Sequence, residues 1–130
     1  MSIIKGHFDD LHFPECNIES FEIAQDSITV SIKKGLEIYP PHPLSSTSKF
    51  DDPCKVIFKG VISSKRIFNE YIKEQRKGFR QYLFNDEITC SYDSSMNYSE
   101  YFIEGLLIKP LGWIEWEITA ADFYIDDLKD

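Results

Sequence analysis

The stretch Trp113-Ile-Glu-Trp-Glu-Ile-Thr-Ala-Ala-Asp-Phe-Tyr-Ile125 decides the fold class of this chain. From position 114 to 120 every second side chain is apolar, and Glu115, Glu117 and Thr119 stand between them. This two-residue period is typical of a half-buried β-strand. At Phe123 and Ile125 the alternation continues with its phase shifted by one residue, as a β-bulge would shift it. The sequence therefore predicts a long strand that contains a bulge.

The same period predicts strands through much of the chain. Ile28, Val30 and Ile32 alternate with polar residues, and the turn-forming residues Gln25-Asp-Ser27 precede them. The predicted strands cover residues 18–24, 28–33 (extended by 36–39), 54–62, 79–84, 88–92 and 101–108. One segment departs from this period, because Ser63-Ser64 resembles a helix cap and the apolar residues that follow have helical spacing. We expect a short helix over 65–77, with a strand as the alternative.

The interval from Tyr39 to Pro53 holds four prolines and four serine or threonine residues, a composition that excludes a central strand. A loop of this length in a small domain is typically either functional or disordered. The other connections between strands are short, which favours antiparallel pairing. We therefore expect one mainly β domain over residues 1–130, an antiparallel β-sandwich or half-open barrel with one short helix. An α+β fold is the alternative.

Charge is sorted along the chain. Residues 1–53 carry nine acids and four bases, residues 54–83 carry two acids and eight bases, and residues 84–130 carry eleven acids and two bases. The formal net charge is −8. Acidic flanks around a basic middle indicate either opposite charges folded together or a surface built for a charged partner. Because phosphate backbones would be repelled by both flanks, a basic protein is the expected partner and nucleic acid is disfavoured.

The cysteines and the chain start point to a reducing compartment. Cys16, Cys54 and Cys90 are odd in number and far apart, which is typical of reduced thiols. The first residues lack the apolar run of a secretory signal, and no run reaches the ~20 apolar residues of a membrane helix. We expect a soluble, cytoplasmic protein that does not enter a membrane.

No catalytic or cofactor motif stands out. His7-Phe-Asp-Asp-Leu-His12, extended by Cys16, could contribute ligands to a metal site, but a second ligand cluster is missing from the sequence. Local hydrogen bonding by Asp9 or Asp10 is the simpler interpretation. There is no Gly-x-Ser-x-Gly and no glycine-rich phosphate loop. We therefore expect no catalytic residues, no metal and no cofactor.

Acidic residues are the candidate partner-binding groups. Glu115 and Glu117 would project from one face of the last strand, about 7 Å apart. They could act as an acid–base pair, but a solvated face or a partner-facing stripe is the more usual role of such residues. Acidic pairs near expected loops and chain ends would also project negative potential. The candidates are Asp9, Asp10, Asp51, Asp52, Asp86, Glu87, Glu115 and Glu117.

The basic segment 65–80 is the best candidate for binding nucleic acid. It interleaves Lys65, Arg66 and Arg80 with aromatic residues such as Phe68 and Tyr82, and single strands bind to such combinations. The alternative is that these cations pair with acids from the flanks or line an exposed helix face.

The chain resembles the small acidic immunity proteins of bacterial toxin–immunity systems, including those of contact-dependent growth inhibition. The residues that carry the likeness are Phe8-Asp-Asp-Leu-His12, Cys54-Lys-Val-Ile-Phe-Lys-Gly-Val61 and Gly112-Trp-Ile-Glu-Trp-Glu-Ile-Thr-Ala120. The resemblance implies a stoichiometric inhibitor of a cognate toxin, often a nuclease with a basic cleft. The basic middle segment departs from simple phosphate mimicry and favours mixed-charge complementarity.

Three functions therefore remain open at the level of sequence. The first is a non-catalytic inhibitor that binds a basic toxin domain. The second is a small enzyme or ligand-binding barrel with an aromatic cavity. The third is a nucleic-acid-binding regulatory module. Exposed strand edges are also compatible with a homodimer.

Overall fold

The computed structural model describes residues 3–72, 78–85 and 92–129. This part of the chain is mainly β-structure, as the sequence predicts. Its strands are β1 (Ile3–Lys5), β2 (Leu11–His12), β3 (Asn17–Ile23), β4 (Ser27–Lys34), β5 (Glu37–Ile38), β6 (Cys54–Tyr71), β7 (Phe79–Asn85), β8 (Ser99–Leu107) and β9 (Gly112–Asp126). A short 3-10 turn, η1 (Phe8–Asp10), lies between β1 and β2.

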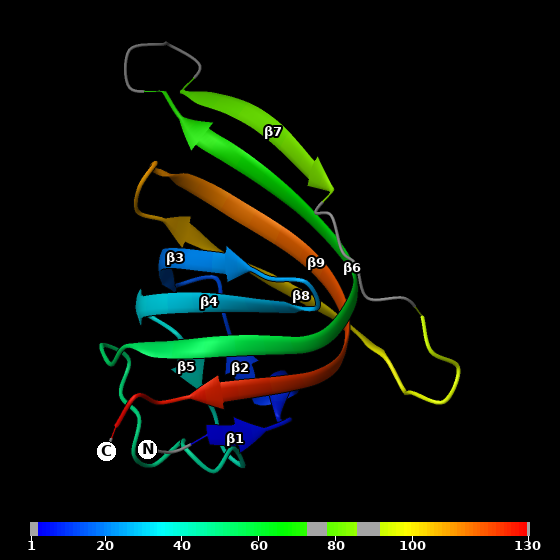
Figure 1. Ribbon diagram of the computed structural model, residues 1–130. Helices are drawn as coiled ribbons and strands as arrows, with labels where there is room; N and C mark the ends of the chain where they lie inside the picture. The colour runs from blue at the N-terminus through cyan, green and yellow to red at the C-terminus, as the bar shows by residue number, and fades with distance from the viewer. Residues whose placement is uncertain (1–2, 73–77, 86–91, 130) are drawn as a thin grey trace.

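Strands β9, β8, β3, β4 and β6 follow one another around a barrel, which closes because β6 also pairs with β9 (Figure 1). The pairs are antiparallel except β3 with β8, which run parallel over residues 17–18 and 106–107. Of the two architectures expected, the barrel is the one found, and it is closed. The predicted strand over 88–92 lies almost wholly outside the described residues.

The barrel has two halves that share β6 and β9. The lower sheet contains β3, β4, residues 54–59 of β6, residues 122–126 of β9, and β1. The upper sheet contains β7, residues 63–71 of β6, residues 112–119 of β9, and β8. Both long strands bend sharply where one sheet passes into the other (Figure 1). Strands that switch sheets in this way are typical of orthogonal packing.

Gly60 lies at this bend. Its φ of +68° favours glycine, and a β-carbon there would lie 2.8 Å from that of Ala121. The burial phase shifts in β9 between Ala120 and Phe123 and in β6 between Phe58 and Val61, so both paired strands shift together. The extra residue is inserted in β6, between Val61 and Ser63. The phase shift in the last strand was predicted correctly, but the bulge lies in its partner.

One core fills the space between the two sheets. Trp116 from the upper sheet and Phe58 and Phe123 from the lower sheet are almost fully buried. The ring centroids of Phe21 and Trp116 are 5.0 Å apart, and the indole Nε1 of Trp116 donates a hydrogen bond to Ser64 Oγ at 2.7 Å. Side chains occupy the barrel centre, and an aromatic-lined hollow of about 280 Å³ lies between Phe21, Phe68, Tyr82 and Phe84.

The helix expected over 65–77 does not form in the described part of that range, because residues 65–71 belong to β6. Residues 73–77 lie outside the described part. The error has a physical reason. Phe68 faces inward and stacks on Tyr82, while its neighbour Ile67 faces the other side opposite Leu83. A strand with apolar contacts on both faces loses its alternation and imitates helical spacing.

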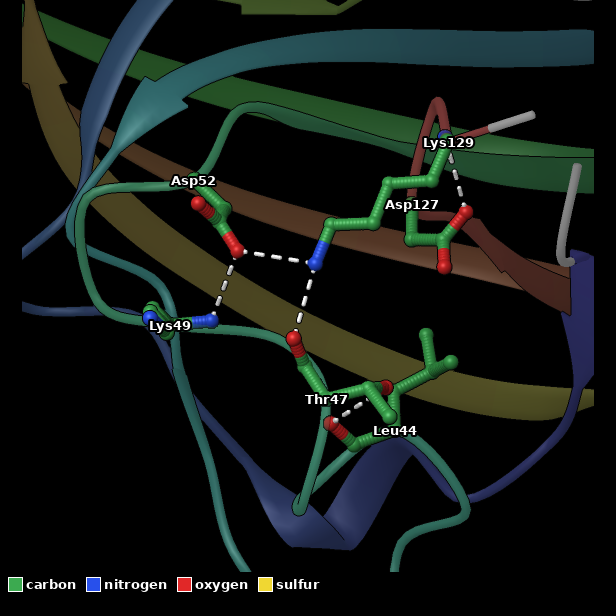
Figure 2. A network of polar contacts seen from close by, with 6 residues as sticks. All are labelled: Leu44, Thr47, Lys49, Asp52, Asp127 and Lys129. Carbon is green, nitrogen blue, oxygen red and sulfur yellow. Dashed lines mark hydrogen bonds and ion pairs between the residues drawn. The ribbon is translucent and has the colours of Figure 1, made fainter.

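The proline-rich loop 39–53 packs onto the barrel. Leu44 joins the core, and the backbone N–H of Gly35 donates to the carbonyl of Phe50 at 2.7 Å. The Lys129 ammonium donates to the carbonyl of Thr47 at 2.7 Å and pairs with the Asp52 carboxylate at 3.0 Å (Figure 2). The chain end therefore holds the loop in place.

Candidate protein-binding face

The outer face of the upper sheet, which points away from the core, is the candidate site. The register brings Phe102, Glu117 and Lys65 side by side in one row across β8, β9 and β6. Side chains directly opposite each other in antiparallel strands share a face. The remaining rows of this face are Glu100–Thr119, Glu104–Glu115–Ile67–Leu83, Leu106–Trp113–Asn69–Gln81 and Leu111–Tyr71–Phe79.

Carboxylates dominate one side of this outer face. Glu104 lies directly opposite Glu115, and like charges in such a position destabilise a sheet. Glu117 lies two residues further along β9, and Glu100 projects from the end of β8. Among the described residues, no ion pair joins any of these four carboxylates to a basic side chain. Lys65 is the only base in the described rows of this face, so four acids are opposed by one cation.

Hollows give this surface its shape. One of about 390 Å³ is bounded by Lys65, Glu115 and Glu117 and by the apolar side chains of Leu83 and Phe102. A neighbouring hollow of about 500 Å³ shares three of these residues and reaches Glu100. Charged groups and apolar surface therefore line the same depressions.

An apolar patch continues the outer face beyond the carboxylates. Trp113 is half-buried there, and the side chains around it are exposed. They line a further hollow of about 390 Å³ whose exposed surface is apolar. The exposed members of the patch are Tyr71, Phe79, Leu106 and Leu111. Exposed apolar groups gathered next to charge are typical of interaction surfaces.

Glu115 and Glu117, which the sequence singled out, therefore lie at the centre of this face. Sequence reasoning missed Glu100 and Glu104. Glu104 lies in the predicted strand 101–108, and Glu100 directly precedes it. Each is two residues from Phe102, so alternation could have placed all three side chains on one face of that strand. Only the register of β8 against β9 shows that Glu104 lies opposite Glu115 and that Glu100 lies in the row next to Glu117.

The other predicted acids lie elsewhere. Asp9 and Asp10 belong to η1, where Asp10 Oδ2 is 3.5 Å from His7 Nδ1. Asp51 is exposed in the proline-rich loop. Asp52 is already used within the molecule, because it accepts the backbone N–H of Lys49 and pairs with Lys129, and these contacts lower its pKa.

The structure thus brings Asp9, Asp10, Asp51 and Asp52 to the region of the proline-rich loop, away from the outer face of the upper sheet. Asp86 and Glu87 lie outside the described residues.

The basic segment does not form one patch over its described residues. Lys65 faces outward, whereas Arg66 faces the core with only 9% of its surface exposed. The Arg66 guanidinium lies 4.6 Å from the ring centre of Phe84, 4.8 Å from that of Phe21 and 4.9 Å from that of Trp116. This cation is enclosed by aromatic rings of its own chain.

The thiols are buried, and neither they nor the imidazoles belong to a metal-binding cluster in the described part. Burial raises the pKa of both Cys16 and Cys54 to about 12, which keeps them as unreactive thiols near neutral pH. Within residues 3–72, 78–85 and 92–129, no three His, Cys, Asp or Glu side chains gather closely enough to hold a metal ion.

Comparison with protein-family models, curated proteins and solved structures finds no match for this chain. No helix in the described part of the chain has the length and hydropathy needed to span a bilayer. The geometry of the outer face is therefore the main guide to function.

Proposed function

We propose that this protein is a non-catalytic binding protein that recognises a basic protein through the outer face of its upper sheet. The observation that carries the proposal is the pair Glu104 and Glu115, placed directly opposite each other on a face whose described rows hold one base, Lys65, and with no ion pair to either carboxylate among the described residues. Their repulsion costs stability in the free protein, and cations of a partner would relieve it. The adjoining apolar patch supplies surface that a partner can bury.

The partner that we propose is a toxin domain, a nuclease being one candidate, and the protein would act as its immunity protein in the cytoplasm. The likeness to immunity proteins in small size, acidity and β-rich sequence supports this choice. An acidic face with apolar borders suits the basic cleft of an enzyme that acts on phosphates. The protein would then inhibit by occupying that cleft.

The test compares two double charge reversals. Glu104→Lys with Glu115→Lys changes the outer face, and Glu19→Lys with Glu22→Lys makes the same charge change on exposed residues of β3. Tagged wild-type protein, incubated at low salt with lysate of the organism that encodes it, is expected to retain one basic protein that salt releases. The β3 variant should retain it, and the outer-face variant should not.

A second step tests inhibition. The gene of the retained protein should slow growth when it is expressed alone, and co-expression of wild-type protein should restore growth. Equal retention by both double variants would rule out the outer face. Failure to protect against the captured protein would rule out the immunity role while leaving the binding face intact.

A further inference from the structure

We infer that β7 is a dimerisation edge, at which a second copy of this chain adds its own β7 in antiparallel orientation. β7 pairs with β6 on one side only, and in the described sheet it is the terminal strand. All seven of its residues are exposed, Leu83 at 71% and Phe79 at 60%.

The hydrogen-bond phase shows which groups of this edge are free to pair. Ile72 N–H donates to the Gly78 carbonyl at 2.7 Å, and Tyr71 N–H donates to the Leu111 carbonyl at 2.9 Å. Because hydrogen-bonded pairs alternate along an antiparallel ladder, even-numbered residues of β7 bond to β6. The backbone groups of its odd-numbered residues point away from β6. These residues are Phe79, Gln81, Leu83 and Asn85.

If the two-fold axis that relates the two copies passes beside Tyr82, the outward backbone groups of all four residues are hydrogen-bonded in both copies. Phe79 then lies opposite Asn85 of the second copy, and Gln81 lies opposite Leu83, giving about eight hydrogen bonds between the chains. Arg80, the one charged residue of β7, lies opposite Phe84, where a cation can contact a ring face. No like charges face each other in this register.

Edge strands of natural proteins are usually protected by lysine, proline, a bulge or short length. Lys5 stands on the other terminal strand, β1, which has three residues. β7 is longer, holds neither lysine nor proline, and pairs with β6 without a register shift. The unprotected edge is therefore β7.

The described residues of β7 favour a second copy as the occupant because the strand is complementary to itself. In the antiparallel register about Tyr82, the one charge of each β7, Arg80, lies opposite the Phe84 ring of the other copy, so pairing opposes no like charges within residues 79–85.

The proposed dimer would place both outer faces on the same side of one continuous sheet, since opposite residues share a face. Two binding faces would then be presented together. The dimer does not depend on the function proposed above, because it uses the free backbone groups at the edge of β7, whereas the proposed toxin contact uses side chains on the outer face of the sheet.

Sedimentation velocity of the full chain from about 1 to 200 µM is the first measurement, and we expect dimers at the upper concentrations. Leu83→Lys places a charge at the edge, and Gln81→Pro removes an outward N–H without touching a backbone hydrogen bond to β6, although it also removes the exposed side-chain bond from Gln81 to Asn69. Each should raise the dimer dissociation constant at least about tenfold with an unchanged circular dichroism spectrum. Phe102→Lys, an equally apolar exposed site on β8, is the matched control and should dimerise like wild type.

A disulfide trap tests the register. In a Cys90→Ser background, Tyr82→Cys places two thiols across the axis in a non-hydrogen-bonded pair, close enough to form a disulfide. Mild oxidation should therefore give a covalent dimer, whereas Arg80→Cys should give none. A wild-type monomer at every concentration, a dimer retained by both edge variants, or equal crosslinking of the two cysteine variants would each overturn the proposal.

Discussion

Ser64 and Trp116 form the contact that fixes the inside of the upper sheet. The Trp116 indole is buried, and its N–H is bonded to Ser64. Ser64→Ala would leave that donor buried without its partner, which costs about 1–3 kcal/mol. We expect a lower urea midpoint for this variant, and Ser63→Ala, on the outer face, should stay within about 0.5 kcal/mol of wild type. Equal effects of the two substitutions would contradict this role.

His42 is the residue that should make the fold sensitive to acid. It is 2% exposed, its Nδ1 accepts the N–H of Leu44, and its Nε2 has no hydrogen-bond partner within the described structure. Burial and the neighbouring His7 lower its pKa, while Asp10 acts in the opposite direction.

Because the folded pKa of His42 is lowered, the unfolded chain binds more protons here once the pH falls below about 6.5. The free energy of unfolding should then decrease until the folded pKa is passed. Urea midpoints at pH 7.5 and pH 5.5 measure this loss, and His42→Gln should reduce the difference between them. An unchanged pH dependence in His42→Gln would assign the acid sensitivity to other groups.

The bend shared by β6 and β9 is the element on which closure of the barrel depends. Gly60→Ala should be destabilising for two reasons, because φ is positive and because the new methyl meets the Ala121 side chain. Gly6→Ala is the matched control, since Gly6 has a φ of +80° and a β-carbon added there would have no neighbouring atom within 4 Å. Thermal unfolding of both variants separates the two destabilising effects, because Gly6→Ala introduces only the backbone strain, whereas Gly60→Ala adds the contact with Ala121. Gly60→Ala should lose at least about 1 kcal/mol more than Gly6→Ala.

The strands with one buried face were the predictable ones. β4 and the first part of β9 alternate because one side meets the core and the other meets solvent. Residues 65–71, the described part of the predicted helix, were mistaken for helix because Arg66 and Phe68 pack inward while Ile67 and Tyr71 carry apolar surface outward. The bulge was assigned to the wrong strand because a shift in one strand's burial does not reveal whether its partner shifts too.

At the scale of the molecule, burial should govern the reactivity of the thiols. Cys16 and Cys54 are buried in the core, with pKa values raised to about 12. In a Cys90→Ser variant, labelling by a disulfide reagent at pH 8 should be about 10³-fold slower than in the unfolded chain. The labelling rate should rise with urea in step with global unfolding. Rapid labelling of either thiol in the native protein would show a local opening of the core.

The candidate face was only half predictable because register is a property of the whole molecule. Alternation gave Glu115 and Glu117 their common face. Nothing in the local sequence shows that Glu104 stands opposite Glu115, since that depends on how the turn around Pro110 sets β8 against β9. The acidic pairs near loops were equally plausible candidates from the sequence, yet Asp52 is held by Lys49 and Lys129.

The alternation along β8 and β9 also separates the residues that stability constrains from those that partner recognition can change. Ile103, Ile114 and Trp116 are held by the core, whereas Glu104, Glu115 and their outward neighbours touch nothing inside. A mutation at an outward position can therefore alter which partner is recognised while foldability is retained. Under the proposed immunity function, such a strand would let the protein follow a diversifying toxin by changing every second residue. Rapid divergence of specificity is then compatible with a constant barrel.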